Sequence, residues 1–264
     1  AIALMLREAL EQDGATAAVV TPAARLARRI EAKLARWGVA ASVSHGAPLR
    51  ETDAGRLIAL LCELARDAGE PVALAALLKH PRATLAGAGL TLLEHKALRG
   101  PRRHDTLAEL ALLGERGEGI KGWHAARKIV EAASAALAPL TALMSHKEVT
   151  LAQFADAVSL AAENVTRSEC WQGRDGEVAA DMLREAIAHG DALGLMPAHA
   201  ASRVLMKLME GREVAPPAMQ GDARVAIWGL LEARLQRRDL MILAGLNEGV
   251  WPAPPGQDPF LSRT

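Results

Sequence analysis

Apolar residues follow two different periods along the chain, and the change of period divides it into three regions. Short apolar runs typical of buried strands occur near both ends, at residues 17–21, 39–44, 224–228 and 239–244. Between about residue 86 and residue 215, apolar residues recur only at helical spacing. The pattern predicts an α/β domain built from residues 1–85 and 220–264, interrupted by an all-helical insertion at 86–219.

The first predicted strand leads directly into a helix. Thr21-Pro22 has the composition of a helix start, with a hydroxyl at the N-cap and proline in the first turn, and the helix is expected to run to Trp37. A helix is also expected over residues 2–12. Because the order strand, helix, strand favours a right-handed crossover, the sheet is expected to be parallel.

The remaining helices are delimited by apolar periodicity and by Gly and Pro at their ends. They are expected at 53–66, 71–79, 90–98, 106–113, 123–143, 150–165, 178–193 and 198–210. The lengths and spacing of the helices from residue 90 onward fit a bundle packed through Leu, Ala and Met.

Composition narrows the function classes. Lys plus Arg and Asp plus Glu balance at 31 each, so nucleic-acid contact must be local. Two cysteines, Cys62 and Cys170, support neither a disulfide framework nor a cysteine metal site, and the eight histidines form no ligand pair. With no long apolar segment and no signal peptide in the sequence, a cytoplasmic protein that does not contact a membrane is expected.

The stretch Met241–Pro252 reads as a buried strand that ends in a tight polar turn. Gly245 and Gly249 bracket Asn247-Glu248, a combination that favours a turn. Ligands gather at the carboxyl ends of strands in open parallel sheets, so this turn is the first candidate site. A strand and loop without a ligand is the alternative.

Two groups of basic residues are further candidates. Arg25 begins a basic stripe on the helix after the first strand and lies where a phosphate could meet the helix N-terminus. Arg99, Arg102, Arg103 and His104 form the densest basic cluster and could clamp a phosphate backbone. A solvated surface without a ligand is an open alternative for both groups.

Other chemical motifs give weaker signals. The glycine-rich segment 114–122 lacks the Gly-Lys-Ser/Thr of a phosphate loop, and it is interpreted as a linker. Neighbouring acids such as Asp175 and Glu177 are interpreted as solvated helix charges rather than catalytic groups.

Several segments together resemble a known family. The segments Ala18–Arg25, Trp37–Val39, Leu230–Leu235, Gly245–Pro252 and Asp258–Arg263 look like the AddB subunits of bacterial AddAB helicase-nucleases in their alphaproteobacterial form. The same order more distantly resembles the second motor half of UvrD-like superfamily 1 helicases. This resemblance implies that the α/β parts form a RecA-like domain, similar to helicase domain 2A, and that the helical block corresponds to the 2B insertion.

The resemblance also implies roles for individual residues. Arg25 matches a residue that approaches the nucleotide's terminal phosphate in active relatives, and Arg234 stands where those relatives have a lysine. The histidine and the Gly-Leu-Glu of that motif are absent here, so we expect no ATP hydrolysis by this region. Single-stranded DNA is expected to contact Thr21, Arg25, Asn247, Glu248 and Trp251, with Trp251 stacking on a base and Arg99, Arg102 and Arg103 touching the backbone.

The function implied is that of a DNA-binding scaffold in double-strand break repair and homologous recombination. An AddA-type subunit would be the partner and supply the motor, while ATP, magnesium and an iron-sulfur cluster would belong to the full complex and no cofactor to this region. Two alternatives are an active superfamily 1 ATPase and a subunit-docking module without DNA contact. Both ends of the sequence read as cut from a longer polypeptide.

Overall fold

The structure is a computed structural model that describes residues 1–44, 46–100, 106–113, 120–215 and 222–252. The chain forms two compact units. The sheet unit contains residues 1–47 and 215–264, and the helical unit contains residues 48–214. Among the described helices, none is long and apolar enough to cross a membrane.

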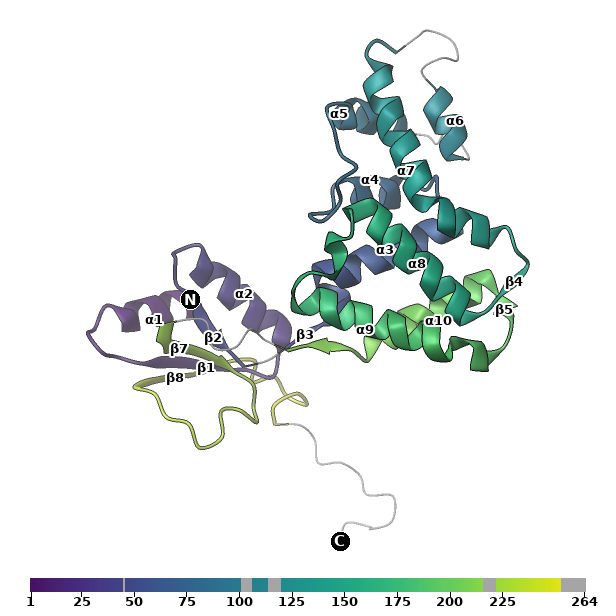
Figure 1. Ribbon diagram of the computed structural model, residues 1–264. Coiled ribbons are helices and arrows are strands. Elements are labelled where there is room, and N and C mark those ends of the chain that lie inside the picture. Colours follow the sequence, from purple (N-terminus) through teal and green to yellow (C-terminus); the bar gives the residue numbers. More distant parts are fainter. Residues whose placement is uncertain (45, 101–105, 114–119, 216–221, 253–264) are drawn as a thin grey trace. The chain divides into compact units, whose positions relative to one another are not determined.

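The sheet unit is built on four parallel strands. They are β1 (Ala17–Val20), β2 (Ala41–Val43), β7 (Asp222–Trp228) and β8 (Leu240–Leu243), in the order β2-β7-β1-β8 (Figure 1). The predicted α/β class with a parallel sheet is confirmed. The two strands joined by the first crossover are not neighbours, however, because β7 pairs with both of them.

Two helices cover one face of this sheet (Figure 1). Helix α1 (Ile2–Leu10) contributes Leu6, and α2 (Ala24–Ala35) contributes Ile30 and Leu34, to a core shared with Val19 and Ile227.

The predicted start of α2 was wrong. The helix begins at Ala24 with Ala23 as its N-cap, and no side chain caps it. Thr21 instead accepts a hydrogen bond at its Oγ1 from the Ala23 N–H, at 3.2 Å. The hydroxyl therefore closes a short turn between the strand and the helix.

The second face of the sheet has a smaller core. Ala18, Val20, Ala226 and Trp228 are buried there, and Leu230, Ala233 and Trp251 pack against them. Strand β8 was predicted to be buried, but Met241 and Leu243 are 37% and 53% exposed. The reason is that β8 is the edge strand, and only its alternate residues Leu240 and Ile242 reach the core under α1 and α2.

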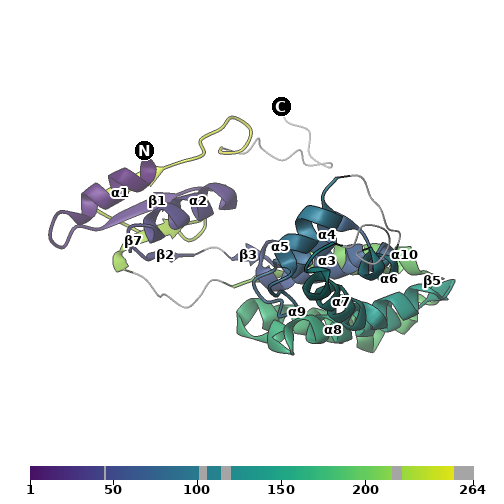
Figure 2. The ribbon, with the colours of Figure 1, turned by 90° about the horizontal axis from the view of Figure 1, so that it is seen from above.

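The helical unit is a bundle with a single core (Figure 2). Its α-helices are α3 (Asp53–Arg66), α4 (Pro71–Leu78), α5 (Leu90–Leu93), α6 (Leu107–Leu112), α7 (Trp123–Met144), α8 (Leu151–Thr166), α9 (Gly173–His189) and α10 (Ala198–Glu210). A π-helix continues α5 over Glu94–Leu98, and 3-10 turns occupy Leu49–Glu51, Glu169–Trp171 and Gly190–Leu193.

Two short strand pairs accompany the helices, and of their four segments only that of β6 was expected to be extended. Strand β3 (Ala47–Pro48) pairs with β6 (Glu213–Val214), and β4 (Glu148–Val149) pairs with β5 (Met196–Pro197). Each of these strands has only two residues, which is too short for an alternating apolar pattern to appear.

The helical unit begins earlier than the sequence pattern indicates. The expected boundary lies at 85/86, whereas the compact unit begins at Pro48. Leu57 and Leu61 of α3 and Leu74 of α4 are buried in the same cluster as Phe154 of α8. Because the apolar faces of α3 and α4 have their partners in the bundle, these helices belong to it rather than to the sheet.

Candidate functional site

Several of the residues that the sequence points to follow the carboxyl ends of β1, β7 and β8. After β1, the Thr21 N–H donates to the Trp228 carbonyl at 3.0 Å, and the Ala244 N–H donates to the Val20 carbonyl at 3.0 Å. Thr21 is 3% exposed. Thr21 therefore has a structural role at the carboxyl ends of the strands, and little of its side chain is accessible to a ligand.

The turn after β8 lies against Thr21. Gly245 has φ +83°, and a Cβ built there would stand 3.1 Å from Thr21 Oγ1 and 3.6 Å from Pro22 Cδ. The Asn247 N–H donates to the Gly245 carbonyl at 2.8 Å, and the Val250 and Trp251 N–H groups both donate to the Asn247 carbonyl at 3.0 Å. The chain folds back on itself here, and a cis peptide bond follows between Trp251 and Pro252. The structure thus brings Thr21 and the Asn247 turn together, as the sequence argument requires.

The side chains available to a ligand at this edge are those that protrude. Asn247 and Glu248 are exposed at the tip of the turn, and Arg25 is exposed in the first turn of α2. Arg234 is exposed on the turn after β7, where its N–H donates to the Leu231 carbonyl at 3.2 Å. The edge therefore presents both cationic and anionic groups, because Glu232, on the same turn as Arg234, is also exposed.

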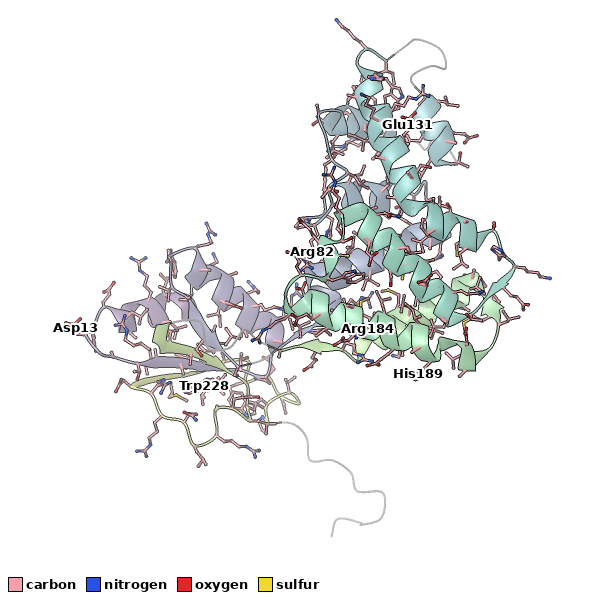
Figure 3. The ribbon with its side chains drawn as sticks, in the orientation of Figure 1. Asp13, Arg82, Glu131, Arg184, His189 and Trp228 are labelled. Carbon is pink, nitrogen blue, oxygen red and sulfur yellow. The ribbon has the colours of Figure 1, made fainter. Side chains whose placement is uncertain are left out.

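The Trp251 ring is not fully available for stacking on a base. Its side chain packs against the second-face core formed by residues such as Val20 and Trp228, and it is half-buried. In the same region the Arg238 guanidinium lies over the Trp228 ring, 5.0 Å from its centroid. Part of the Trp251 ring thus packs in the core of the second face, next to Trp228, which is labelled in Figure 3.

Ser44 also belongs to this edge, and the sequence argument missed it. Its Oγ accepts a hydrogen bond from the Gly229 N–H at 3.1 Å, and its N–H donates to the Ile227 carbonyl at 3.1 Å. Ser44 ties the end of β2 to the end of β7. Its position as the last residue of a predicted strand was the only available signal.

The basic cluster of the helical unit is partly neutralised. Glu94 accepts hydrogen bonds from Lys79 and from Arg99, whose Nη2 lies 2.6 Å from Glu94 Oε1. The hydrogen bond from Lys79, and then that from Arg99, lowers the pKa of the Glu94 carboxyl to about 2. Arg99 therefore has an intramolecular partner, which weakens its case as a phosphate clamp. Arg102, Arg103 and His104 lie outside the described residues.

A second polar cluster lies in the helical unit, and in it Asp175 is not the solvated charge that was predicted, although its neighbour Glu177 is exposed. Asp175 Oδ1 and Oδ2 accept from Arg82 Nη2 at 2.7 and 2.8 Å, and Asp175 Oδ2 also accepts from the Ala54 N–H at 3.0 Å (Figure 3 labels Arg82). Burial favours a raised pKa for Asp175, but the hydrogen bonds from Ala54 and Arg82 outweigh it and the pKa is lowered. Arg82 Nη1 also donates to the Cys170 carbonyl at 2.7 Å. Because the Asp175 carboxylate and the Arg82 guanidinium both have hydrogen-bond partners, the cluster holds segments of the bundle together rather than serving as a catalytic site.

The described residues do not suggest metal or thiol chemistry. Within them, no three His, Cys, Asp or Glu side chains gather as a metal site would require. Cys62 and Cys170 are both buried and unbridged, and burial raises the pKa of the Cys62 thiol to about 12. Such a thiol stays protonated and unreactive at neutral pH.

Comparison with known proteins leaves this geometry as the main guide to function. A scan of the sequence against models of protein families and a search of curated proteins each returned no match.

Proposed function

We propose that this chain is a DNA-binding scaffold region of a helicase-nuclease subunit of the AddB type, acting in double-strand break repair and homologous recombination. The observation that supports the proposal is the surface at the carboxyl ends of the strands in the sheet unit, formed by Thr21, Arg25 and the turn Gly245–Trp251, which we call the strand-end edge. There, Thr21 and Gly245 fix a protruding turn beside α2, which leaves Asn247, Glu248 and Arg25 exposed. Exposed polar groups at the carboxyl ends of parallel strands are suited to a ligand.

The order of the elements supports the same proposal. The chain leaves the sheet after β2, passes through the helical unit, and returns to the sheet at β7. In our proposal the sheet unit is a RecA-like domain similar to helicase domain 2A, and the helical unit is its 2B-like insertion. The protein would work in the cytoplasm with an AddA-type partner, which supplies ATP hydrolysis with magnesium.

The residues at the strand-end edge favour DNA binding rather than ATP hydrolysis in this region. Phosphoryl transfer needs cationic groups converging on the phosphate and a residue that positions the nucleophile. Arg25 and Arg234 are the exposed guanidinium groups noted at the edge, and the turn after β7 carries Leu231 where active relatives are expected to have histidine. We therefore assign to the edge a contact with a single DNA strand and no catalytic step.

The test is binding of a fluorescein-labelled oligothymidylate by the full chain, followed by anisotropy at several salt concentrations. Arg25→Ala and Asn247→Ala should each lower affinity several-fold, and Arg25→Ala should also reduce the salt dependence, because a lost phosphate contact releases one fewer counterion. Trp251→Ala is a poor probe, since the ring also supports the second-face core.

Arg36→Ala provides the matched control. Arg36 is exposed at the opposite end of α2 from Arg25, so it reports the effect of removing a cation from the same helix without touching the strand-end edge. If Arg25→Ala and Asn247→Ala bind as tightly as Arg36→Ala and the unmodified chain, the edge does not contact DNA. Capture of an AddA-type subunit without DNA retention would then favour the docking function.

A further inference from the structure

A groove of about 700 Å³ runs between α3 and α10 in the helical unit, separate from the strand-end edge. The two helices pack through a hydrogen bond from Ser202 Oγ to the Cys62 carbonyl at 3.3 Å. Arg50, just before α3, reaches Glu210 at the end of α10, so the helices run in opposite directions. The groove therefore follows the length of α3, roughly 20 Å for its 14 residues.

Positive charge predominates along this groove. Four cationic side chains line it, Arg50, Arg66, Arg203 and Lys207, against two carboxylates, Glu63 and Glu210. Glu210 is already engaged, because Lys207 Nζ lies 2.7 Å and Arg50 Nη1 lies 3.7 Å from its carboxylate oxygens. Arg66 and Arg203 are exposed and form no ion pair with any residue that the structure describes.

Polar side chains on α10 repeat at regular intervals along the groove. His199, Arg203 and Lys207 are spaced four residues apart and all line the groove, so they form one row at intervals of about 6 Å along the helix. A row of evenly spaced donors in a concave surface suits a ligand whose negative charges also repeat. A single phosphate would use only one or two of these positions.

The lining also shows how such a ligand would be held. Between the charged groups the groove is lined by Ala59, Cys62 and Met206, and none of its lining residues is Trp or Phe. The imidazole of His199 is the one aromatic ring in this lining, so contacts to the backbone outnumber places where a base could stack. A second hollow of about 460 Å³ shares Arg50, Ala59 and Glu63 with the groove and adds Arg56 and Lys79. Both added cations are already paired, Arg56 with Asp53 and Lys79 with Glu94, so Arg66 and Arg203 remain the cations of the groove that no described residue pairs.

We infer that the groove between α3 and α10 binds the phosphate backbone of a single nucleic-acid strand without reading its sequence. The inference extends the proposed DNA-binding function to a second surface, and it concerns residues that the strand-end edge does not use.

The experiment measures binding of labelled dT and dA oligomers to the full chain carrying Arg66→Ala and Arg203→Ala together. We expect affinity to fall at least tenfold at low salt for both oligomers alike. For single strands each lost contact lowers the slope of log affinity against log salt by about 0.7, so the double variant should lose about 1.4. Both residues are solvent-exposed, so circular dichroism and thermal melting should be unchanged.

Lys147→Ala is the control, because Lys147 is an exposed cation of the same unit that does not line the groove. An unchanged affinity and salt slope in the double variant would overturn the inference, and so would equal losses in the Lys147→Ala control. Competition by polyglutamate as effective as that of an oligonucleotide of equal charge would also overturn it in favour of an acidic protein partner. Because Arg25→Ala is measured separately, failure at the groove is distinguishable from failure at the strand-end edge.

Discussion

The two units are stabilised in different ways. The helical unit has one continuous core, and all of that core's buried residues lie between Leu49 and Val214. The sheet unit has two separate cores, one on each face, and it needs chain from both ends of the sequence. Among the residues that the structure describes, its second face buries only Ala18, Val20, Ala226 and Trp228 and leaves Met241 and Leu243 exposed. Continuity of sequence and core makes the helical unit the independent structure, whereas the sheet unit depends on long-range pairing.

The largest effect should appear when the units are separated. Residues 48–214 expressed alone should give a helical circular dichroism spectrum and a cooperative melt, because the whole core cluster is retained. Residues 1–47 alone should stay unfolded, since β1 and β2 each pair with β7, which this fragment lacks. A molten spectrum for residues 48–214 would show that the helical unit is not independent.

Within the helical unit, the core should respond strongly to a cavity. Phe154 is fully buried at the centre of the cluster, so Phe154→Ala should lower the free energy of unfolding by about 3–5 kcal/mol. Leu160 lies on the same helix but is 45% exposed, and Leu160→Ala should cost far less. Denaturant titration followed by circular dichroism measures both. Similar losses for the two variants would contradict a tightly packed single core.

A smaller effect is expected at the strand-end edge of the sheet unit. Gly245→Ala places a Cβ 3.1 Å from Thr21 Oγ1 in a left-handed backbone conformation, whereas Gly249→Ala has a similar φ of +78° but no atom within 4 Å. Both should lose about 1 kcal/mol from backbone strain. Gly245→Ala should lose more, and only it should also weaken DNA binding. Equal losses in thermal melts would show that the contact with Thr21 is easily relieved.

The contrast between the units also explains how far the sequence could predict them. Helices α7, α8 and α10 begin and end within one residue of their predicted bounds, because periodicity and capping are local properties, as the Thr150 hydroxyl with Gln153 shows at the start of α8. The order β2-β7-β1-β8 depends on pairing between distant segments. From its sequence, the run Leu240–Leu243 is predicted to be a buried strand. Only the tertiary structure shows that β8 lies at the edge of the sheet.

The candidate site follows the same rule. The Gly245 and Gly249 turn could be found from local composition, and both glycines do have positive φ. The contact of Gly245 with Thr21, and the bond from Gly229 to Ser44, needed the sheet. The Arg82–Asp175 pair joins residues 93 positions apart, and no sequence spacing could have distinguished it from solvated charge.

The two units should also differ in their response to acid. His80 is buried, its Nδ1 accepts from the Arg82 N–H at 3.2 Å, and its Nε2 lies 3.0 Å from the Asp53 carbonyl, an arrangement that suits the neutral ring. Burial is the main reason that the pKa of His80 lies below 6.5. In the sheet unit, hydrogen bonds from the Thr16 hydroxyl and N–H lower the pKa of Asp239 below 3.8. The folded-state pKa of His80 in the helical unit thus lies below 6.5, and that of Asp239 in the sheet unit lies below 3.8.

The direction in which stability changes with pH follows from these two pKa shifts. A group whose pKa is depressed by folding stabilises fully above its unfolded value and loses that contribution as the pH falls through its folded value. The helical unit should therefore weaken as the pH drops below about 6.5, by at most about 1.4 kcal/mol per pH unit, while the Asp239 contribution is retained until below pH 3.8. Denaturant titrations of His80→Gln at pH 7.5 and 5.5 should lack this loss, and His146→Gln, an exposed histidine, should keep it. If His80→Gln weakens with acid as much as the unmodified chain does, the buried ring is not the source of the pH dependence.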